Sequence, residues 1–389
     1  MAGVQEINQI EQLAEYRQTW WSLLEQTAGA SFFQSLEWLE VYWRHFGAGQ
    51  RLRTLLVAAH DGRPTGIVPL VVRRESTRVG RLRVLTYPLH DWGSFYGPIG
   101  HEPGATLAAA LEHVRHTERD WDILELRWLG APGTEARQTA QAMRDAGFQA
   151  HRTIWDRTAV VELSGSWDAY FAGRCRAWRR NYRHAGKKLA EQGEVTFLRH
   201  RPGGRGQGDG DPRWDLYDAC EQIAARSWQA SATNGTTLSH ESVRAFLRDA
   251  HAAAADAGAL DMDLLLLDGR PLAFVYNYHW RGYVYGLRLG FDAQQSEAGA
   301  GTIVLGESIR DSFARGDRLY DLGVGSLECK RHFRTGMADI FRCSHFPGTA
   351  LRAQLLRLKR WAQGLVLARR ESPAFIAVGR VQDGTADAR

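Results

Sequence analysis

The sequence predicts an α/β (α+β) fold made of two domains in tandem, and an internal repeat is the first observation behind this prediction. The run Asp-Gly-Arg-Pro occurs twice, beginning at Asp61 and at Asp268, 207 residues apart. An apolar run precedes each copy and another follows it, which is typical of a β-hairpin with a tight turn. The elements predicted after each turn also follow the same order. We therefore predict a duplicated α/β domain.

Each copy of the turn is followed by two strands, a glycine-bearing loop, a helix and a further strand. After the first turn these elements are predicted at 67–73, 82–87, 93–104, 105–117 and 121–127. After the second turn they are predicted at 272–280, 283–289, 292–301, 302–315 and 319–323. The shared order favours duplication over a chance match of four residues.

The remaining segments complete the predicted organisation. Helical patterns cover 7–26 and 35–46, and in the second of these Trp38, Val41 and Tyr42 have the spacing of a buried face. A chain of 389 residues is long enough for two domains with a core each. We expect an N-terminal domain over residues 1–152, a C-terminal domain over 153–348, and a basic amphipathic helix with a flexible tail over 349–389.

Composition narrows the class of protein. The 44% hydrophobic and 24% charged residues are ordinary for a globular protein, and no apolar stretch reaches the roughly 18 residues that span a membrane. The N-terminus lacks the features of a secretory signal. The four cysteines have neither metal-site nor disulfide spacing, so we expect no metal site and a reduced, cytoplasmic protein. The net charge of +5 is a weak indication of an anionic partner.

Two arginine-rich segments each allow two interpretations. Residues 174–188 interleave arginine and lysine with aromatic residues, which suits a grip on phosphates or a nucleic acid. The same pattern suits an amphipathic helix with a packed aromatic face and a solvated charged face. Residues 352–370 could contact a membrane surface or dock on their own protein. In both segments the packing interpretation is the simpler one, and nucleic-acid binding is not expected.

The junction between the second loop and its helix, Ser296–Leu305, is the strongest candidate for a ligand site. Gly299 and Gly301 let the backbone approach a ligand closely, and the N–H groups of a first helical turn attract an anion. This order of strand, glycine turn and helix resembles the acyl-CoA site of the GNAT fold, whose signature is Gln/Arg-x-x-Gly-x-Gly/Ala. Ser296 departs from that signature, and Glu297 would oppose a pyrophosphate.

Further short motifs occur at Phe33–Leu39, the Arg174–Lys188 segment followed by Gly193, Gly269–Phe274, Gly290–Asp292 and Gly316–Phe333. Together these motifs resemble the CelD/BcsL-type acetyltransferases, GNAT proteins associated with cellulose and exopolysaccharide production. The resemblance covers about residues 15–345. That family is related to the FemABX peptidyltransferases, which carry two GNAT-like domains in tandem.

The resemblance implies two tandem GNAT-like domains, each a mixed, mainly antiparallel sheet flanked by helices. It implies that the second domain binds acetyl-CoA or another acyl-CoA as a co-substrate, with no permanently bound cofactor. In the first copy, Pro98 and Pro103 remove N–H donors and Glu102 adds negative charge, so that half is expected to shape the acceptor site. The donor residues are then Gly299, Ala300, Gly301 and Thr302, with the pantetheine arm pairing near Leu287 and Leu289.

Two residues are candidates for catalysis. Lys330 lies in Cys329-Lys330-x-x-Phe333, which matches a Tyr/Cys-Lys-x-x-Phe pattern of the family, and it could hold the donor carbonyl or a developing oxyanion. Its structural alternative is an ion pair with Asp321 or Glu328. Asp321, predicted at a strand end, could orient the acceptor or act as a base, or it could make a structural hydrogen bond.

The acceptor side is predicted in the first half. Asp91, Trp92 and Tyr96 lie in an aromatic and polar loop whose rings suit a sugar, although a rigid packed loop would have the same composition. Tyr276, in the second half, is a further candidate that core packing also explains.

These observations predict a GNAT-type acyltransferase that transfers an acyl group, most simply acetyl, from acyl-CoA to an amine or hydroxyl. The acceptor is expected to be a sugar, a polysaccharide or a cell-envelope precursor. The alternatives are a FemABX-like aminoacyl-tRNA-dependent transferase and a non-catalytic GNAT module of polysaccharide machinery.

Overall fold

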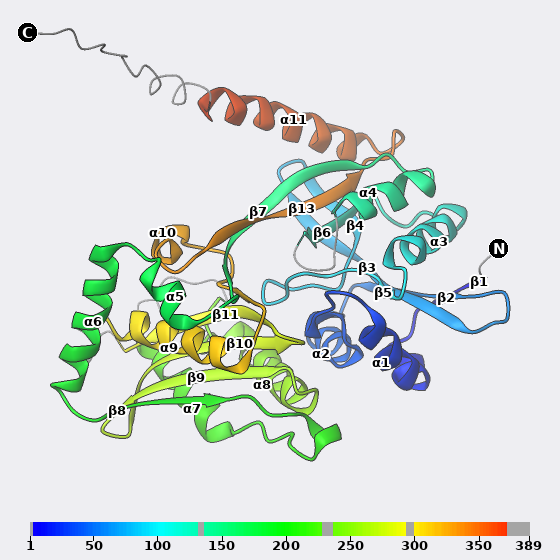
Figure 1. The fold of residues 1–389 in the computed structure, drawn as a ribbon. Coiled ribbons are helices and arrows are strands. Elements are labelled where there is room, and N and C mark those ends of the chain that lie inside the picture. The colour runs from blue at the N-terminus through cyan, green and yellow to red at the C-terminus, as the bar shows by residue number, and fades with distance from the viewer. Residues whose placement is uncertain (1–2, 131–135, 228–235, 293–298, 372–389) are drawn as a thin grey trace, which may run out of the picture.

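A computed structural model describes residues 3–130, 136–227, 236–292 and 299–371, the last eight of them by backbone alone. Its strands form one long sheet in the order β1-β2-β3-β4-β6-β13-β7-β12-β11-β10-β9-β8, and β5 pairs with β3 (Figure 1). The strands are β1 (Gly3–Ile7), β2 (Arg51–Ala58), β3 (Pro64–Thr77), β4 (Gly80–Thr86), β5 (Ile99–Gly100), β6 (Ile123–Leu129), β7 (His151–Glu162), β8 (Val195–His200), β9 (Leu260–Leu267), β10 (Arg270–Trp280), β11 (Tyr283–Phe291), β12 (Leu319–Asp321) and β13 (Gly336–His345).

Helices cover the sheet in both halves (Figure 1). The α-helices are α1 (Arg17–Gln26), α2 (Leu36–Phe46), α3 (Pro103–His116), α4 (Ala136–Asp145), α5 (Trp167–Ala172), α6 (Arg176–Ala190), α7 (Trp214–Arg226), α8 (Glu241–Asp256), α9 (Ala300–Arg315), α10 (Leu327–Lys330) and α11 (Leu351–Glu371). Short 3-10 turns occur at Ile10–Tyr16, Phe32–Gln34 and Arg205–Gln207.

The internal repeat is visible in the strand pairing. Both Asp-Gly-Arg-Pro turns join an antiparallel hairpin, β2 to β3 and β9 to β10. Gly62 and Gly269 have φ of 82° and 75°, a conformation that favours glycine and is common in tight hairpin turns. In each half a parallel strand follows a helix, because β6 joins β4 after α3 and β12 joins β11 after α9. The predicted order of elements after each turn is therefore confirmed.

The last strand of each half pairs with the other half. By the order of the repeat, β7 is the last strand of the first half, although most of it lies in the predicted C-terminal domain 153–348. It pairs with β12 of the second half, in the register Val160↔Asp321. β13 comes at the end of the second half but pairs with β6 of the first, in the register Ser344↔Glu125. β7 and β13 also pair with each other. This exchange joins the two halves into one sheet.

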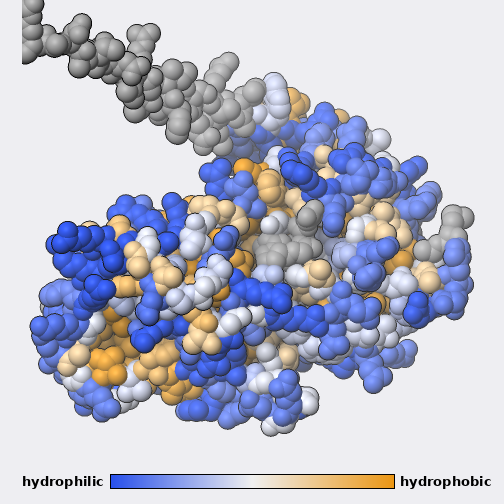
Figure 2. Space-filling model, in the orientation of Figure 1, coloured by the Kyte–Doolittle hydropathy of each residue, from blue (hydrophilic) through white to orange (hydrophobic). Residues whose placement is uncertain are grey.

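The halves also share a hydrophobic core. On β9 and β10, alternate side chains face opposite sides of the sheet, as the two-residue period of a strand requires. Leu265 and Val275 pack with α9, whereas Leu264 and Phe274 belong to the larger core that contains α7 and α8. That core continues into the first half, where the Trp38 ring of α2 lies 5.6 Å from the Phe246 ring of α8. The face of the molecule in Figure 2 is mostly hydrophilic, with apolar residues in separate smaller patches.

Candidate functional site

A pocket lies between the two halves, at the place where β11 and β12 separate. The first half contributes the loop after β4 and the end of β6, and the second half contributes β11 and the chain after β12. The pocket holds about 30 Å³, enough for a water-sized group but too little for a whole substrate. Its lining residues are Asp91, Trp92, Gly93, Ser94, Phe95, Trp128, Thr158, Tyr285, Gly286, Leu287, Arg288, Asp321, Gly323 and Val324.

Asp321 is the buried acid of this pocket. Its Oδ1 atom accepts hydrogen bonds from the Thr158 hydroxyl at 2.5 Å and from the Gly323 backbone N–H at 2.6 Å. Among the described residues, Oδ2 has no hydrogen bond. Burial raises the pKa of Asp321 to about 6, although both hydrogen bonds and the nearby Lys330 act in the opposite direction. A carboxyl group with this pKa can take a proton near neutral pH.

Lys330 does not line the pocket, but it donates hydrogen bonds to two residues that do. Its Nζ atom donates to the backbone carbonyls of Gly323 at 2.6 Å and Val324 at 2.8 Å. Within the described residues it forms no ion pair with Asp321 or Glu328, so neither of the predicted structural alternatives is what the geometry shows. Burial lowers the pKa of Lys330 to about 8, against the influence of Asp321.

The chain after β12 passes very close to β11. A Cβ atom placed on Gly323 would lie 2.4 Å from the Gly286 carbonyl oxygen, and one on Gly286 would lie 2.7 Å from the Asp321 carbonyl oxygen. Gly323 also has φ of 75°. Glycine is therefore required at both positions 286 and 323, where the chain after β12 passes β11. This close approach places Asp321 beside β11.

The first half contributes aromatic side chains to the pocket. Trp92 is buried, and the Arg288 guanidinium lies 4.0 Å from the centre of its ring. Phe95 and Trp128 also line the pocket, and both have positive φ, 49° and 60°. This backbone conformation is uncommon for bulky residues and is often associated with functional sites.

Two polar groups of β11 were not among the predicted site residues. The Tyr285 hydroxyl is buried without a hydrogen-bond partner among the described residues, and burial raises the pKa of Tyr285. Arg288 donates to the backbone carbonyls of Thr236 and Leu287. Burial lowers the pKa of Arg288 to about 10, while Asp91 opposes this shift. Within the described residues, Arg288 forms no ion pair.

One edge of β11 extends beyond its pairing with β12. β12 pairs with only three residues of β11, namely Tyr283, Val284 and Tyr285. On the other side, the register with β10 shifts so that Tyr276 pairs with Arg288 and Asn277 with Gly286. Leu287 is therefore the extra residue of a β-bulge.

The predicted donor loop ends beside this edge. Gly299 caps α9 in the left-handed conformation, and the Thr302 N–H donates to its carbonyl at 2.9 Å. Ala300 is fully buried. A Cβ atom on Gly301 would lie 3.2 Å from Leu289 Cδ2, so the helix begins directly against β11. Ser296 and Glu297 lie outside the described residues.

Two predicted acceptor residues lie outside the pocket lining. Tyr96 is fully buried, and its hydroxyl has no partner among the described residues. Tyr276 is fully buried in the second half, where its hydroxyl lies 3.0 Å from His251 Nδ1. The structure thus brings Asp91 and Trp92 together with Asp321, but not with Tyr96 or Tyr276.

The arginine-rich segment forms most of α6. Trp178 and Leu189 are buried, whereas Arg176, Arg180 and Lys187 are exposed, which fits the amphipathic interpretation. The helix is also close to the donor loop, because a Cβ atom on Gly299 would contact the Ala185 side chain at 3.4 Å.

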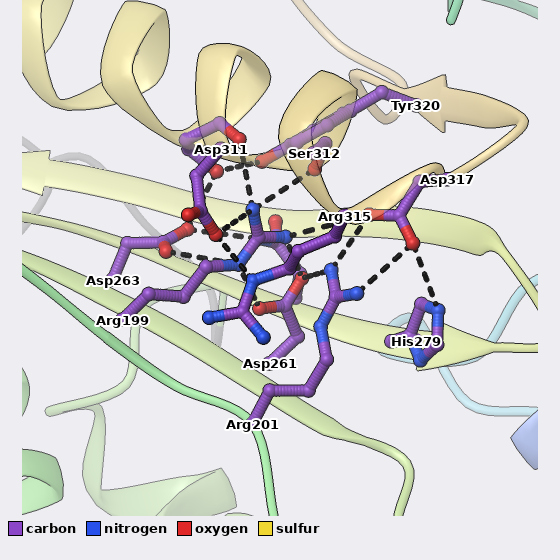
Figure 3. Close-up of polar contacts among 12 residues, drawn as sticks. Arg199, Arg201, Asp261, Asp263, His279, Asp311, Ser312, Arg315, Asp317 and Tyr320 are labelled. Carbon is purple, nitrogen blue, oxygen red and sulfur yellow. Dashed lines mark hydrogen bonds and ion pairs between the residues drawn. The ribbon is translucent and has the colours of Figure 1, made fainter.

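A second cluster of charges lies in the interior of the second half, under α9 (Figure 3). The Arg199 guanidinium donates to both carboxylate oxygens of Asp261, at 2.7 and 2.6 Å, and lies 3.3 Å from Asp263. It also donates to the Ser308 carbonyl of α9. The cluster therefore ties β8 and β9 to α9. Arg201, His279, Asp311, Ser312 and Asp317 extend it.

A wider groove of about 900 Å³ lies in the first half, between α1 and the start of α3. Its lining includes Arg63, His101, Glu102 and Thr106. Pro103 is at the first turn of α3 and Glu102 caps it without a side-chain hydrogen bond. In the described ranges, His, Cys, Asp and Glu side chains do not gather into a group of three that could hold a metal ion.

Comparisons with known proteins agree on the fold. Residues 176–331 match the family model described as "Acetyltransferase (GNAT) domain". A search of curated proteins gives no match. Among solved structures, FemX is similar, with 11% sequence identity, a TM-score of 0.56, and coverage of 87% of this chain and 96% of FemX. A C-terminal DUF2156 domain from Agrobacterium fabrum is similar at 10% identity and a TM-score of 0.51, over 88% of this chain and 95% of that domain.

A tandem GNAT protein from the clavulanic acid biosynthesis pathway also matches, with 12% identity and a TM-score of 0.47, over 88% of this chain and 98% of that protein. At such low identities the similarity concerns the fold. The predicted α/β class, with a mixed, mainly antiparallel sheet built from two similar halves, is confirmed. Over residues 176–331 the chain is similar to a GNAT acetyltransferase domain.

Proposed function

We propose that this protein transfers an acyl group from an acyl-CoA to an amine or hydroxyl group of a sugar or cell-envelope precursor. The observation that carries the proposal is the pocket where β11 and β12 separate. The carboxyl group of Asp321 is buried in this pocket, and α9 begins against β11 beside it. The GNAT family match covers this part of the chain and supports an acyl-CoA donor.

The donor is proposed to lie along the part of β11 that extends beyond its pairing with β12, toward the start of α9. The pantetheine arm would pair with the backbone near Leu287 and Leu289 as an added strand does. The phosphates would lie toward Gly299, Ala300, Gly301 and Thr302, where the helix dipole favours negative charge. The basic helix α6 packs beside this end and adds to the positive potential.

The chemistry is proposed to be direct transfer. The acceptor nitrogen or oxygen attacks the thioester carbonyl, the new C–N or C–O bond forms, and the C–S bond breaks. Asp321 takes the proton from the acceptor, since its pKa of about 6 leaves it mostly ionised at neutral pH. Tyr285 carries a protonated hydroxyl at the pocket and is proposed to return a proton to the leaving thiolate.

Lys330 is proposed as a positioning residue. Its two hydrogen bonds fix Gly323 and Val324, both of which line the pocket, so the ammonium group acts through the loop. On the acceptor side, Asp91 and Trp92 face the same pocket from the first half. The first half would then select the acceptor, and the second half would bind the donor.

The donor step is tested by calorimetric titration of the full chain with acetyl-CoA and with longer acyl-CoAs. Thr302→Glu is the informative variant, because an acid near a helix N-terminus favours folding but repels a phosphate. Thr302→Val is its uncharged control. We expect binding by the wild type and by Thr302→Val, and weak binding by Thr302→Glu. Failure of the wild type to bind any CoA ester would reject the proposal.

Turnover is tested by release of free CoA thiol with a panel of amino sugars and sugar alcohols. CoA binding without turnover on any acceptor would favour a non-catalytic GNAT module. A FemABX-like alternative has its own readout, namely salt-dependent binding of aminoacyl-tRNA that weakens when Arg176 and Arg180 of α6 are neutralised.

A further inference from the structure

Helix α11 presents two different apolar faces, and only one of them is covered. On the covered face, Ala353 is fully buried and Leu356 is 6% exposed, in a small cluster with Val84 and Phe346. The Arg360 guanidinium forms an ion pair with Glu125 of β6, a fully buried carboxylate. These contacts fix the helix on the sheet.

The opposite face of α11 exposes large apolar side chains. Leu351, Leu355 and Leu358 are spaced by four and three residues and so share one face of the helix. They are 79%, 57% and 56% exposed, and Trp361, one turn after Leu358, is 64% exposed. These four are among the most exposed large apolar residues of the described structure. A contiguous stripe of this kind normally marks an interaction site.

Positive charge borders the stripe. Arg352, Arg357 and Lys359 are exposed, and none of them forms an ion pair with a described residue. Residues 351–363 contain no aspartate or glutamate. A stripe of leucines with a tryptophan at one end and unpaired basic residues beside it has the character of a helix that lies in a membrane interface.

The same charges argue against a second copy of this chain as the partner. Two such helices facing each other would bring their basic residues together without an acid to neutralise them. A partner surface with negative charge and accessible apolar groups would match both the basic residues and the exposed apolar side chains of α11. None of the described helices is long and apolar enough to cross a membrane, so the contact would lie along the surface.

We propose that the exposed face of α11 binds an anionic lipid surface, with Leu351, Leu355, Leu358 and Trp361 among the headgroups and the basic residues on the lipid phosphates. The inference does not depend on acyl transfer, because α11 packs on β4 and β6 and shares no residue with the pocket.

Flotation of the full chain with lipid vesicles tests the proposal. We expect binding to vesicles that contain phosphatidylglycerol, little binding to pure phosphatidylcholine, and weaker binding at high salt. Arg352→Glu/Lys359→Glu should reduce the bound fraction at least about tenfold. Arg176→Glu/Arg180→Glu on α6 makes the same change of net charge elsewhere, and it should retain most of the binding.

Leu355→Asp/Leu358→Asp tests the contribution of the exposed leucines. It leaves unchanged the face of α11 that packs on the sheet. We expect it to lose vesicle binding while keeping the wild-type thermal unfolding midpoint. Equal binding by the wild type and both α11 variants would overturn the proposal, as would a wild type that does not float. If the leucine variant instead converts an oligomer to a monomer without affecting flotation, the stripe is a contact between copies and the proposal is wrong.

Discussion

Asp321 and Lys330 form hydrogen bonds with the same backbone residue, Gly323, one with its N–H group and the other with its carbonyl group. The Asp321 carboxylate accepts the Gly323 N–H at 2.6 Å, and the Lys330 ammonium donates to the Gly323 carbonyl, also at 2.6 Å. The acid and the amine are therefore coupled through one residue of the pocket wall. They fix the crossing of β11 that gives the pocket its shape.

Asp321→Asn should separate catalysis from stability. We expect a loss of activity of about 10²- to 10⁴-fold, since the amide cannot take a proton. In the wild type, activity should fall as pH drops through about 6, the pKa of Asp321. Folding raises this pKa above the ordinary value of 3.8, so the carboxyl group costs stability as pH rises between these two values.

The amide removes that cost, and Asp321→Asn should therefore be at least as stable as the wild type at pH 8. Urea unfolding and a pH–rate profile on the same preparations measure both effects. A variant that loses activity and stability together would indicate a structural role for Asp321.

Lys330→Met should leave the Gly323 and Val324 carbonyls without their donor. We expect a loss of about 1–3 kcal/mol in the free energy of unfolding and a lower kcat. Lys330→Arg can still donate and should recover part of both. Folding lowers the pKa of Lys330 from 10.5 to about 8, so wild-type stability should rise with pH in this interval. The methionine variant should lack this rise.

Gly323→Ala should disrupt the crossing of the two strands. The methyl group would clash with the Gly286 carbonyl, and the positive φ adds strain. Gly325→Ala is the matched control, because Gly325 has φ of 109° but open space around its Cβ position. Activity and thermal unfolding should suffer much more in the first variant. Equal effects would mean that backbone strain alone, and not the close approach, limits this loop.

Two tyrosines should respond in opposite ways to removal of the hydroxyl group. Tyr276→Phe loses a buried hydrogen bond to His251 and should cost about 1 kcal/mol of stability with little change in KM. Tyr285→Phe loses a hydroxyl with no described partner and should reduce kcat with little effect on stability. A changed acceptor KM in Tyr276→Phe would support the sequence-based assignment of Tyr276 to the acceptor site.

The two aspartates of β9 should differ in the charge cluster under α9. Asp261→Asn leaves the buried Arg199 and Arg201 without their shared carboxylate and should cost about 3–5 kcal/mol. Burial, with the charge of Asp261 beside it, raises the pKa of Asp263, although Arg199 acts in the opposite direction. The charge of Asp263 is thus less favoured than that of Asp261, and Asp263→Asn should cost less. Urea unfolding of both variants at pH 7 provides the comparison.

The hairpins and the start of α9 could be predicted because short stretches of sequence determine them. The two Asp-Gly-Arg-Pro turns predicted both hairpins, and the glycines at 299 and 301 predicted the start of α9 within two residues. The exchange of β7 and β13 had no such signal. Strand pairing between segments so far apart in sequence is decided by tertiary packing, which the pattern of one strand does not encode.

The candidate site was predictable only in part for the same reason. Of the predicted residues, Asp91, Trp92, Leu287 and Asp321 line the pocket. Thr158, Tyr285 and Arg288 line it too, but they had no sequence signal and join these residues only in the folded chain. The charge cluster does have a sequence signal. Asp261 and Asp263 alternate within an apolar strand, while Arg199 on the neighbouring strand β8 and Arg201 directly after it have the same spacing. Acids and bases with matching two-residue spacing indicate paired faces of adjacent strands.

The exchange of β7 and β13 has a consequence for biosynthesis. β6 is complete at Leu129, but its neighbour β13 begins at Gly336, roughly two hundred residues later. At about 5–20 residues per second, a ribosome needs on the order of 10–40 seconds to make that interval. During this time the nascent chain carries an open strand edge, which is prone to wrong pairing. We therefore expect the sheet of the first half to be completed only after the last strand of the second half has been made.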